Sequence, residues 1–87
     1  MSKRLEDIIQ ITFGKILRKH RLQQKLSQEN LAELANLDRT YISQLERGLK
    51  SPSFKTLIAL AQALNVKAHI IVSDVENDLD TLLNMRS

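Results

Sequence analysis

The stretch LSQENLAELANLDRTYISQLERG, from Leu26 to Gly48, decides the fold of this chain. Ser27 and Asp38 both favour the N-cap of a helix, because their side-chain oxygens accept hydrogen bonds from free backbone N–H groups. Asn36, between them, tolerates a positive φ better than most residues, as a chain reversal requires. The stretch therefore predicts two short helices joined by a tight turn, over about 28–35 and 39–46.

Apolar residues recur in this stretch at the spacing that packs one helix onto the other. Ile42 and Leu45 lie three apart, so both face the same side of the second helix. Ala32 is small at a point where two crossing helices must approach closely. The same pattern predicts that Leu31 and Leu34 face the core, that Ala35 lies beneath the turn and that Leu37 fills it.

The opposite face of the second helix is polar. It carries Arg39, Thr40, Ser43 and Gln44, whose hydrogen-bonding ends suit base edges or phosphates. A helix that is buried on one side and offers such a face on the other is typical of a helix that enters the DNA major groove. The sequence therefore predicts double-stranded DNA as a partner.

Apolar residues continue at helical spacing on either side of this stretch. Before it, five inward-facing residues predict a helix over about 7–24: Ile9, Phe13, Ile16, Leu17 and His20. Gly14 weakens that helix by roughly 1 kcal/mol relative to alanine. After the stretch, Ser53 is a favourable N-cap for a helix over about 54–64.

The last quarter of the chain is ambiguous. In the segment VKAHIIV, from Val66 to Val72, the β-branched residues are compatible with a short strand. Val66 and Ile70 lie four apart, however, and we favour a fifth helix. The fold class is thus an all-α, five-helix compact domain over 9–73, with an extra helix or a short strand at its end. We expect a flexible N-terminal arm over 1–8 and an acidic C-terminal tail over 74–87.

The charge of the chain is unevenly distributed. Residues 1–73 hold 12 Lys/Arg and 6 Asp/Glu, whereas residues 74–87 hold one Arg and four Asp/Glu. A basic body suits a polyanionic partner. The chain has no cysteine, so disulfides and thiolate metal sites are excluded. Neither a signal peptide nor an apolar run of membrane-spanning length is evident, so we expect a cytoplasmic, nucleoid-associated protein with no membrane partner.

The sequence offers no support for catalysis, a cofactor or a metal. His20 and His69 do not have metal-ligand spacing, and His20 is better explained as a packed helix residue. Asp74, Glu76, Asp78 and Asp80 alternate as at the start of a calcium loop, but Leu79 replaces the required glycine and Met85 replaces the final Glu. We predict a solvated acidic turn there, and a protein that is not an enzyme.

The sequence resembles the helix-turn-helix family that includes the phage repressor and Cro proteins and the xenobiotic-response-element-type bacterial regulators. The resemblance covers residues 11–72. It rests on Arg21, on the segments 26–32 and 42–48, and on Pro52-Ser53 followed by Leu57, Leu60, Ala61 and Leu64. Asn36 departs from the pattern, because the family usually has Gly there. The resemblance implies a transcriptional regulator that binds inverted-repeat operators as a homodimer, with half-sites about 10 bp apart.

The resemblance also implies residue roles. Base edges would be read by Arg39, Thr40 and Gln44. The DNA backbone would be contacted by Gln28, Tyr41, Ser43, Arg47, Lys50 and Ser53. Arg21 and Glu46 match a pair that forms an internal salt bridge.

Dimerisation is assigned by exclusion to apolar residues beyond the DNA-binding part: Val66, Ile70, Ile71, Leu79 and Leu82. The alternative is that this tail folds onto its own domain. Three alternative roles also stay open. Residues 37–43 resemble controller proteins of restriction–modification systems. An antitoxin would bind a toxin, in some cases through a C-terminal strand. An interaction module would have kept the fold and lost DNA binding.

Overall fold

The computed structural model of the protein describes residues 2–84. Its helices are α1 (Lys3–Gln23), α2 (Gln28–Ala35), α3 (Arg39–Glu46), α4 (Phe54–Ala63) and α5 (Ala68–Asn84). Residues 2–84 contain no strand. The predicted all-α, five-helix architecture is confirmed.

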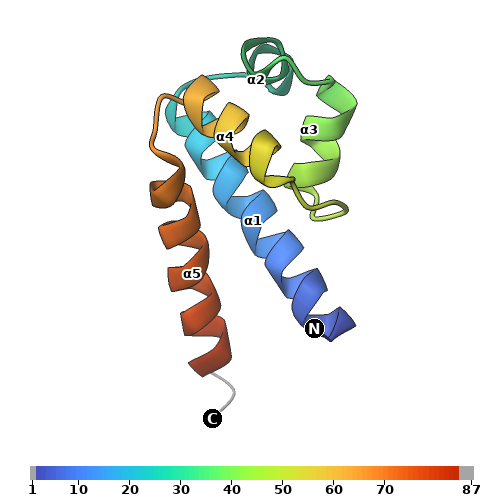
Figure 1. Ribbon diagram of the computed structural model, residues 1–87, viewed down its shortest axis with the longest axis vertical. Helices are drawn as coiled ribbons and strands as arrows, with labels where there is room; N and C mark the ends of the chain where they lie inside the picture. Colours follow the sequence, from blue (N-terminus) through green and yellow to red (C-terminus); the bar gives the residue numbers. More distant parts are fainter. Residues whose placement is uncertain (1, 85–87) are drawn as a thin grey trace.

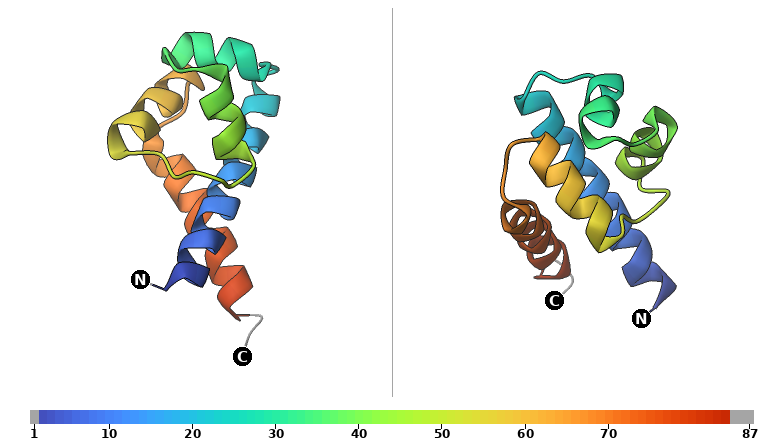
Figure 2. Two further views of the ribbon diagram at one scale, coloured as in Figure 1. Left: turned by 90° about the vertical axis from the view of Figure 1, so that its right-hand side faces the viewer. Right: turned by 45° about the horizontal axis from the view of Figure 1, so that its top comes forward.

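The two longest helices, α1 and α5, lie side by side and run in opposite directions (Figures 1 and 2). The three short helices gather at the end where α1 finishes and α5 begins, and α3 packs against both α1 and α2. The molecule is therefore elongated, with principal extents of 41 × 21 × 20 Å. None of the described helices is by itself long and apolar enough to cross a membrane.

The core is aliphatic and draws on every helix. Its fully buried large side chains are Leu17, Leu31, Ile42, Leu45, Leu60, Leu64 and Ile71. Phe13 adds an aromatic ring that is almost completely buried. Because the stretch from Leu26 to Gly48 supplies three of these seven side chains, α2 and α3 are part of the core rather than an appendage to it.

The predicted helix caps are confirmed. The Ser27 hydroxyl accepts a hydrogen bond from the Asn30 N–H at 2.9 Å, and the Asp38 carboxylate accepts one from the Thr40 N–H at 3.2 Å. Asn36 ends α2 in the left-handed conformation, with φ 56° and ψ 46°. The turn at Asn36 and the cap at Asp38 together set the direction in which α3 leaves α2.

The N-terminal helix begins earlier than the apolar pattern predicts. Ser2 caps it, accepting a hydrogen bond from the Leu5 N–H at 3.1 Å, so helix α1 includes residues 3–8, which we expected to be a flexible arm. The physical reason lies at the far end of the chain. Leu5 and Ile8 are half-buried and share a pocket with Leu83 of α5, which gives this turn a surface to pack on.

The C-terminal segment is one continuous helix, so the short strand is wrong, and the expected boundary at 73–74 falls inside α5. Ile71, Val75 and Leu79 recur every four residues across that boundary, and the side chain of Ile71 is fully buried. The four acidic residues from Asp74 to Asp80 are accordingly helical, not a solvated turn. Among residues 2–84, no cluster of His, Asp or Glu is placed to hold a metal ion. Met85 lies outside the described residues.

A side-chain hydrogen bond joins α5 to α1. His20 is 7% exposed, and its Nε2 lies 2.7 Å from Oδ2 of Asp74. The expected packed role of His20 is confirmed, and the hydrogen bond explains why one acid of α5 is turned inward.

The prediction that Leu34 faces the core is wrong. It is 61% exposed, whereas Leu31, Ala32 and Ala35 are buried. The buried face of α2 is centred among those three residues, and Leu34 is rotated from that centre by roughly 100° around the helix. A three-residue spacing from Leu31 is therefore compatible with either the core or the solvent.

Candidate nucleic-acid interface

Helix α3 is anchored on one side and open on the other. Ile42 and Leu45 are fully buried beneath it. Arg39 and Thr40 are exposed in its first turn, and Ser43 and Gln44 follow half-exposed in the next. At the 100° rotation per residue of an α-helix, these four polar residues form one continuous face. The structure therefore brings together the residues that were predicted to read base edges, on a helix at the molecular surface (Figure 1).

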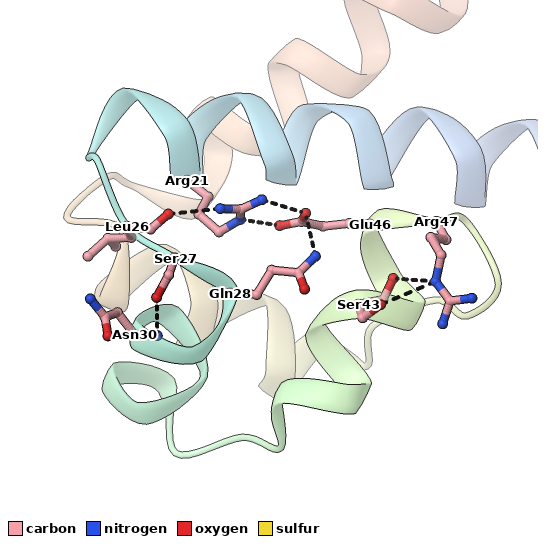
Figure 3. A network of polar contacts seen from close by, with 8 residues as sticks. All are labelled: Arg21, Leu26, Ser27, Gln28, Asn30, Ser43, Glu46 and Arg47. Atoms are coloured by element: carbon pink, nitrogen blue, oxygen red, sulfur yellow. Dashed lines mark hydrogen bonds and ion pairs between the residues drawn. The ribbon is translucent and has the colours of Figure 1, made fainter.

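The end of α3 is held to α1 by a buried ion pair (Figure 3). Arg21 Nε and Nη2 donate to the two carboxylate oxygens of Glu46, at 2.6 and 2.9 Å. The side chains of Arg21 and Glu46 are 9% and 3% exposed. The hydrogen bond to Glu46 raises the pKa of Arg21, although burial acts in the opposite direction. The guanidinium therefore stays charged, and the pair is a bidentate link between two helices.

The same network reaches the start of α2. Arg21 Nη1 donates to the carbonyl oxygen of Leu26 at 2.8 Å, and Gln28 Nε2 donates to Oε1 of Glu46 at 3.1 Å. Gln28 is the first residue of α2, so its amide lies between α2 and α3 (Figure 3). One network thus fixes the positions of both helices of the pair relative to α1.

The residues predicted to contact the DNA backbone do not lie in equivalent settings. Arg47 is exposed, and its Nε donates to the carbonyl and hydroxyl oxygens of Ser43 at 3.3 and 3.2 Å. Its terminal nitrogens have no partner within residues 2–84 (Figure 3). Lys50 and Ser53 are exposed around the loop before α4, where the Ser53 hydroxyl also caps that helix. Tyr41 is partly buried against the core, so only part of its side chain is accessible.

Two positioning residues were missed by the sequence analysis, and they are the only glycines of the chain. A Cβ on Gly14 of α1 would lie 2.4 Å from the carbonyl oxygen of Leu45 and 2.6 Å from that of Glu46. A Cβ on Gly48, where φ is 74°, would lie 2.9 Å from the Cα of Ile11. The backbones of α1 and of the end of α3 therefore touch. The signal for this contact was a glycine inside a helix, a locally unfavourable choice that indicates close packing.

The five residues assigned to dimerisation do not share one surface. Ile71 is fully buried in the core of its own chain, which removes it from any interface, and Val66 is partly buried against that core. Ile70 and Leu82 are 42% and 47% exposed, and Leu79 is half-buried. The assignment of Ile71 fails because the helical periodicity of α5 directs apolar residues inward, toward α1 and α4, as well as outward.

Comparisons with known proteins agree with this geometry. The helix-turn-helix family profile matches residues 17–71. The chain is 41% identical over 64 residues to the immunity repressor protein of Bacillus phage phi105, covering 74% of this chain and 44% of that protein. It is 49% identical over 49 residues to control protein C.SmaI of Serratia marcescens, covering 56% of this chain and 58% of that protein. The chain thus spans about half the length of these two curated relatives.

A solved structure extends the likeness to three dimensions. The restriction–modification controller protein C.AhdI of Aeromonas hydrophila superposes with a TM-score of 0.69 at 39% sequence identity, covering 70% of this chain and 92% of that one.

Proposed function

This chain belongs to the helix-turn-helix family of the Cro and phage-repressor type, and on that premise we propose that it is a sequence-specific regulator of transcription that binds double-stranded DNA. The observation that carries the proposal is the polar face of α3: Arg39, Thr40 and Gln44 are accessible, while Ile42 and Leu45 hold the helix from beneath. Arg and Gln are the side chains that pair bidentately with guanine and adenine. The role requires no catalysis, and it places the protein in the cytoplasm on the nucleoid.

The proposed complex is a homodimer on an inverted repeat. Two copies that dock on one face of a duplex have half-sites about 10 bp apart. Backbone contacts from Gln28, Arg47 and Lys50 would set the register of each copy, and the α3 face would supply the sequence preference. Phosphate contacts also make the affinity strongly dependent on salt.

The direct test of base readout is the double variant Arg39→Ala, Gln44→Ala. Each bidentate contact contributes about 1–3 kcal/mol of discrimination, so we expect affinity for the selected operator to fall about 30-fold or more. Neither side chain is buried, so the thermal midpoint should stay unchanged. Fluorescence anisotropy on a duplex selected from a random library measures the first quantity, and circular dichroism measures the second.

The matched control is Lys67→Ala, an exposed cation outside both proposed contact sets. It removes the same charge and should leave operator affinity within about two-fold. Unchanged operator binding by the double variant would show that the α3 face does not read DNA. It would favour a protein-interaction module that has kept the fold.

Lys50 is proposed to contact phosphate rather than a base. Lys50→Ala should therefore weaken binding to all duplexes by a similar factor and lower the slope of log K against log salt by about one. Arg39→Ala should instead weaken the selected operator much more than a scrambled duplex. Titrations on both duplexes at several salt concentrations separate the two patterns. A Lys50→Ala variant that loses affinity for the operator alone contradicts the phosphate assignment.

A controller protein of a restriction–modification system is the second candidate role. The likeness to C.SmaI and the 92% coverage of C.AhdI support it. Neighbouring genes for a DNA methyltransferase and a nuclease would be decisive evidence. The antitoxin role, with a toxin as partner, is less well supported, because the segment that could have formed its C-terminal strand is the start of α5.

A further inference from the structure

The first residue of α4 is a large aromatic side chain left in water. Phe54 is 79% exposed, the highest value among the large apolar residues of the described chain. An aromatic ring contributes a large hydrophobic gain when it is covered, and aromatic residues are enriched at protein–protein interfaces. The exposed ring of Phe54 is therefore available to contact another molecule.

An open apolar pocket lies next to this residue, between α1, α4 and α5. Its volume is about 230 Å³. A cavity of about 150 Å³ is enough to hold benzene, so this pocket can accept a phenyl ring. Its walls include Ile9, Pro52, Leu57, Val72, Val75 and Glu76, and Glu76 is the one charged residue among all those that line it.

Phe54 is flanked in the chain by two residues of the pocket wall. Pro52 lies two residues before Phe54, and Leu57 lies one helical turn after it, and both line the pocket. Phe54 itself is not part of the lining, so its own chain leaves the pocket open. A projection and a hollow on one face are what an isologous dimer requires, because each copy then offers the other both halves of the contact.

Charge supports a second copy as the occupant. Lys55 follows Phe54 directly and is exposed, while Glu76 is exposed at the pocket. Neither residue forms an ion pair within residues 2–84. When the ring of one copy enters the pocket of the other, Lys55 of the first is carried toward Glu76 of the second, and the symmetry repeats the pair.

Much of this pocket lies outside the segment that the family profile matches. Ile9, Val72, Val75 and Glu76 lie outside residues 17–71, the segment that the family profile matches. The contact is therefore built largely from parts of α1 and α5 that the helix-turn-helix segment does not specify.

We propose that two copies of this protein associate by mutual insertion of Phe54 into the α1–α4–α5 pocket, with Lys55 of each copy paired to Glu76 of the other. This interface rests on the proposed homodimer and centres on Phe54, Lys55 and Glu76, none of which the sequence analysis assigned to dimerisation. It predicts which residues join the two DNA-binding units.

Sedimentation equilibrium of the full chain over a range of micromolar concentrations tests the contact. Phe54→Ala should raise the dimer dissociation constant about 30-fold, without lowering the thermal midpoint of the monomer. Lys55→Glu and Glu76→Lys should each weaken the dimer, and the double variant should restore it to within about three-fold of the original. The matched controls Ile70→Asp, Lys67→Glu and Asp80→Lys alter exposed residues outside the pocket and should leave the dimer intact.

The outcomes separate this interface from the DNA-binding function. A wild-type monomer, an unchanged dissociation constant for Phe54→Ala, a charge swap without restoration, or dissociation by Ile70→Asp alone overturns the interface. Operator binding by the same samples is measured independently by anisotropy. A monomer that binds a half-site would contradict the interface but support the DNA-binding function. A dimer that binds no selected duplex would support the interface but contradict the DNA-binding function.

Discussion

Replacing Gly14 with alanine should destabilise the protein by about 3 kcal/mol, the upper end of typical overpacking effects. For a domain of this size such a loss lowers the thermal midpoint by more than about 10 °C. Helix propensity alone predicts the opposite, a gain of roughly 1 kcal/mol. Contact decides the sign, because the added methyl group would lie 2.4 and 2.6 Å from two backbone carbonyl oxygens of α3. A backbone oxygen at the end of a helix cannot move aside as a flexible side chain can.

Thermal and urea unfolding of Gly14→Ala provide the measurement. Lys15→Ala is the matched control, because it is the next residue of the same helix and is exposed. It should change the free energy of unfolding by no more than about 0.5 kcal/mol. A Gly14→Ala variant as stable as the wild type would mean that α1 and α3 do not approach each other as closely as this structure has them.

Replacing Glu46 with alanine should destabilise the protein by about 3–5 kcal/mol. The change leaves the guanidinium of Arg21, whose side chain is 9% exposed, without its carboxylate partner. It also removes the acceptor of the Gln28 amide. A guanidinium keeps its proton at neutral and mildly alkaline pH, so deprotonation offers no relief in this variant and the loss of stability should be constant across that range.

Chemical denaturation of three variants separates the charge from the packing. Glu46→Gln keeps the shape and a hydrogen-bonding oxygen, so its loss should be smaller than that of Glu46→Ala. The double variant Arg21→Met, Glu46→Leu replaces the pair by apolar side chains and should recover much of the stability. If Glu46→Ala unfolds at the wild-type denaturant concentration, the pair does not anchor α3.

The helix pair and its polar face could be predicted because their signals are local. Ser27, Asp38 and Asn36 act on backbone groups within a few residues. The spacing of Ile42 and Leu45 indicates which side of α3 is buried. The accessible positions of Arg39 and Thr40 follow from that spacing. Contact with DNA bases and phosphates stays a prediction that the binding experiments test.

Predictions failed where a residue depends on a distant segment. The helix start at Lys3 and the unbroken course of α5 arise because α1 and α5 pack on each other. Leu34 lies three residues after the buried Leu31, yet its position around α2 leaves it exposed to solvent. Ile71 is apolar, as a residue of an interface would be, yet it is buried in the core of its own chain.

The amino-acid sequence by itself determined the helix pair, its caps, its turn and its exposed polar face, because each depends on neighbours within about one or two helical turns. Only the tertiary structure decided the role of the two glycines and the exposure of Phe54 beside an open pocket. By helix propensity alone, Gly14 lowers the stability of α1, but it permits the backbone of α1 to contact the end of α3. That role depends on the distance between Gly14 and Leu45, which are far apart in the chain, and periodicity carries no information about such a distance.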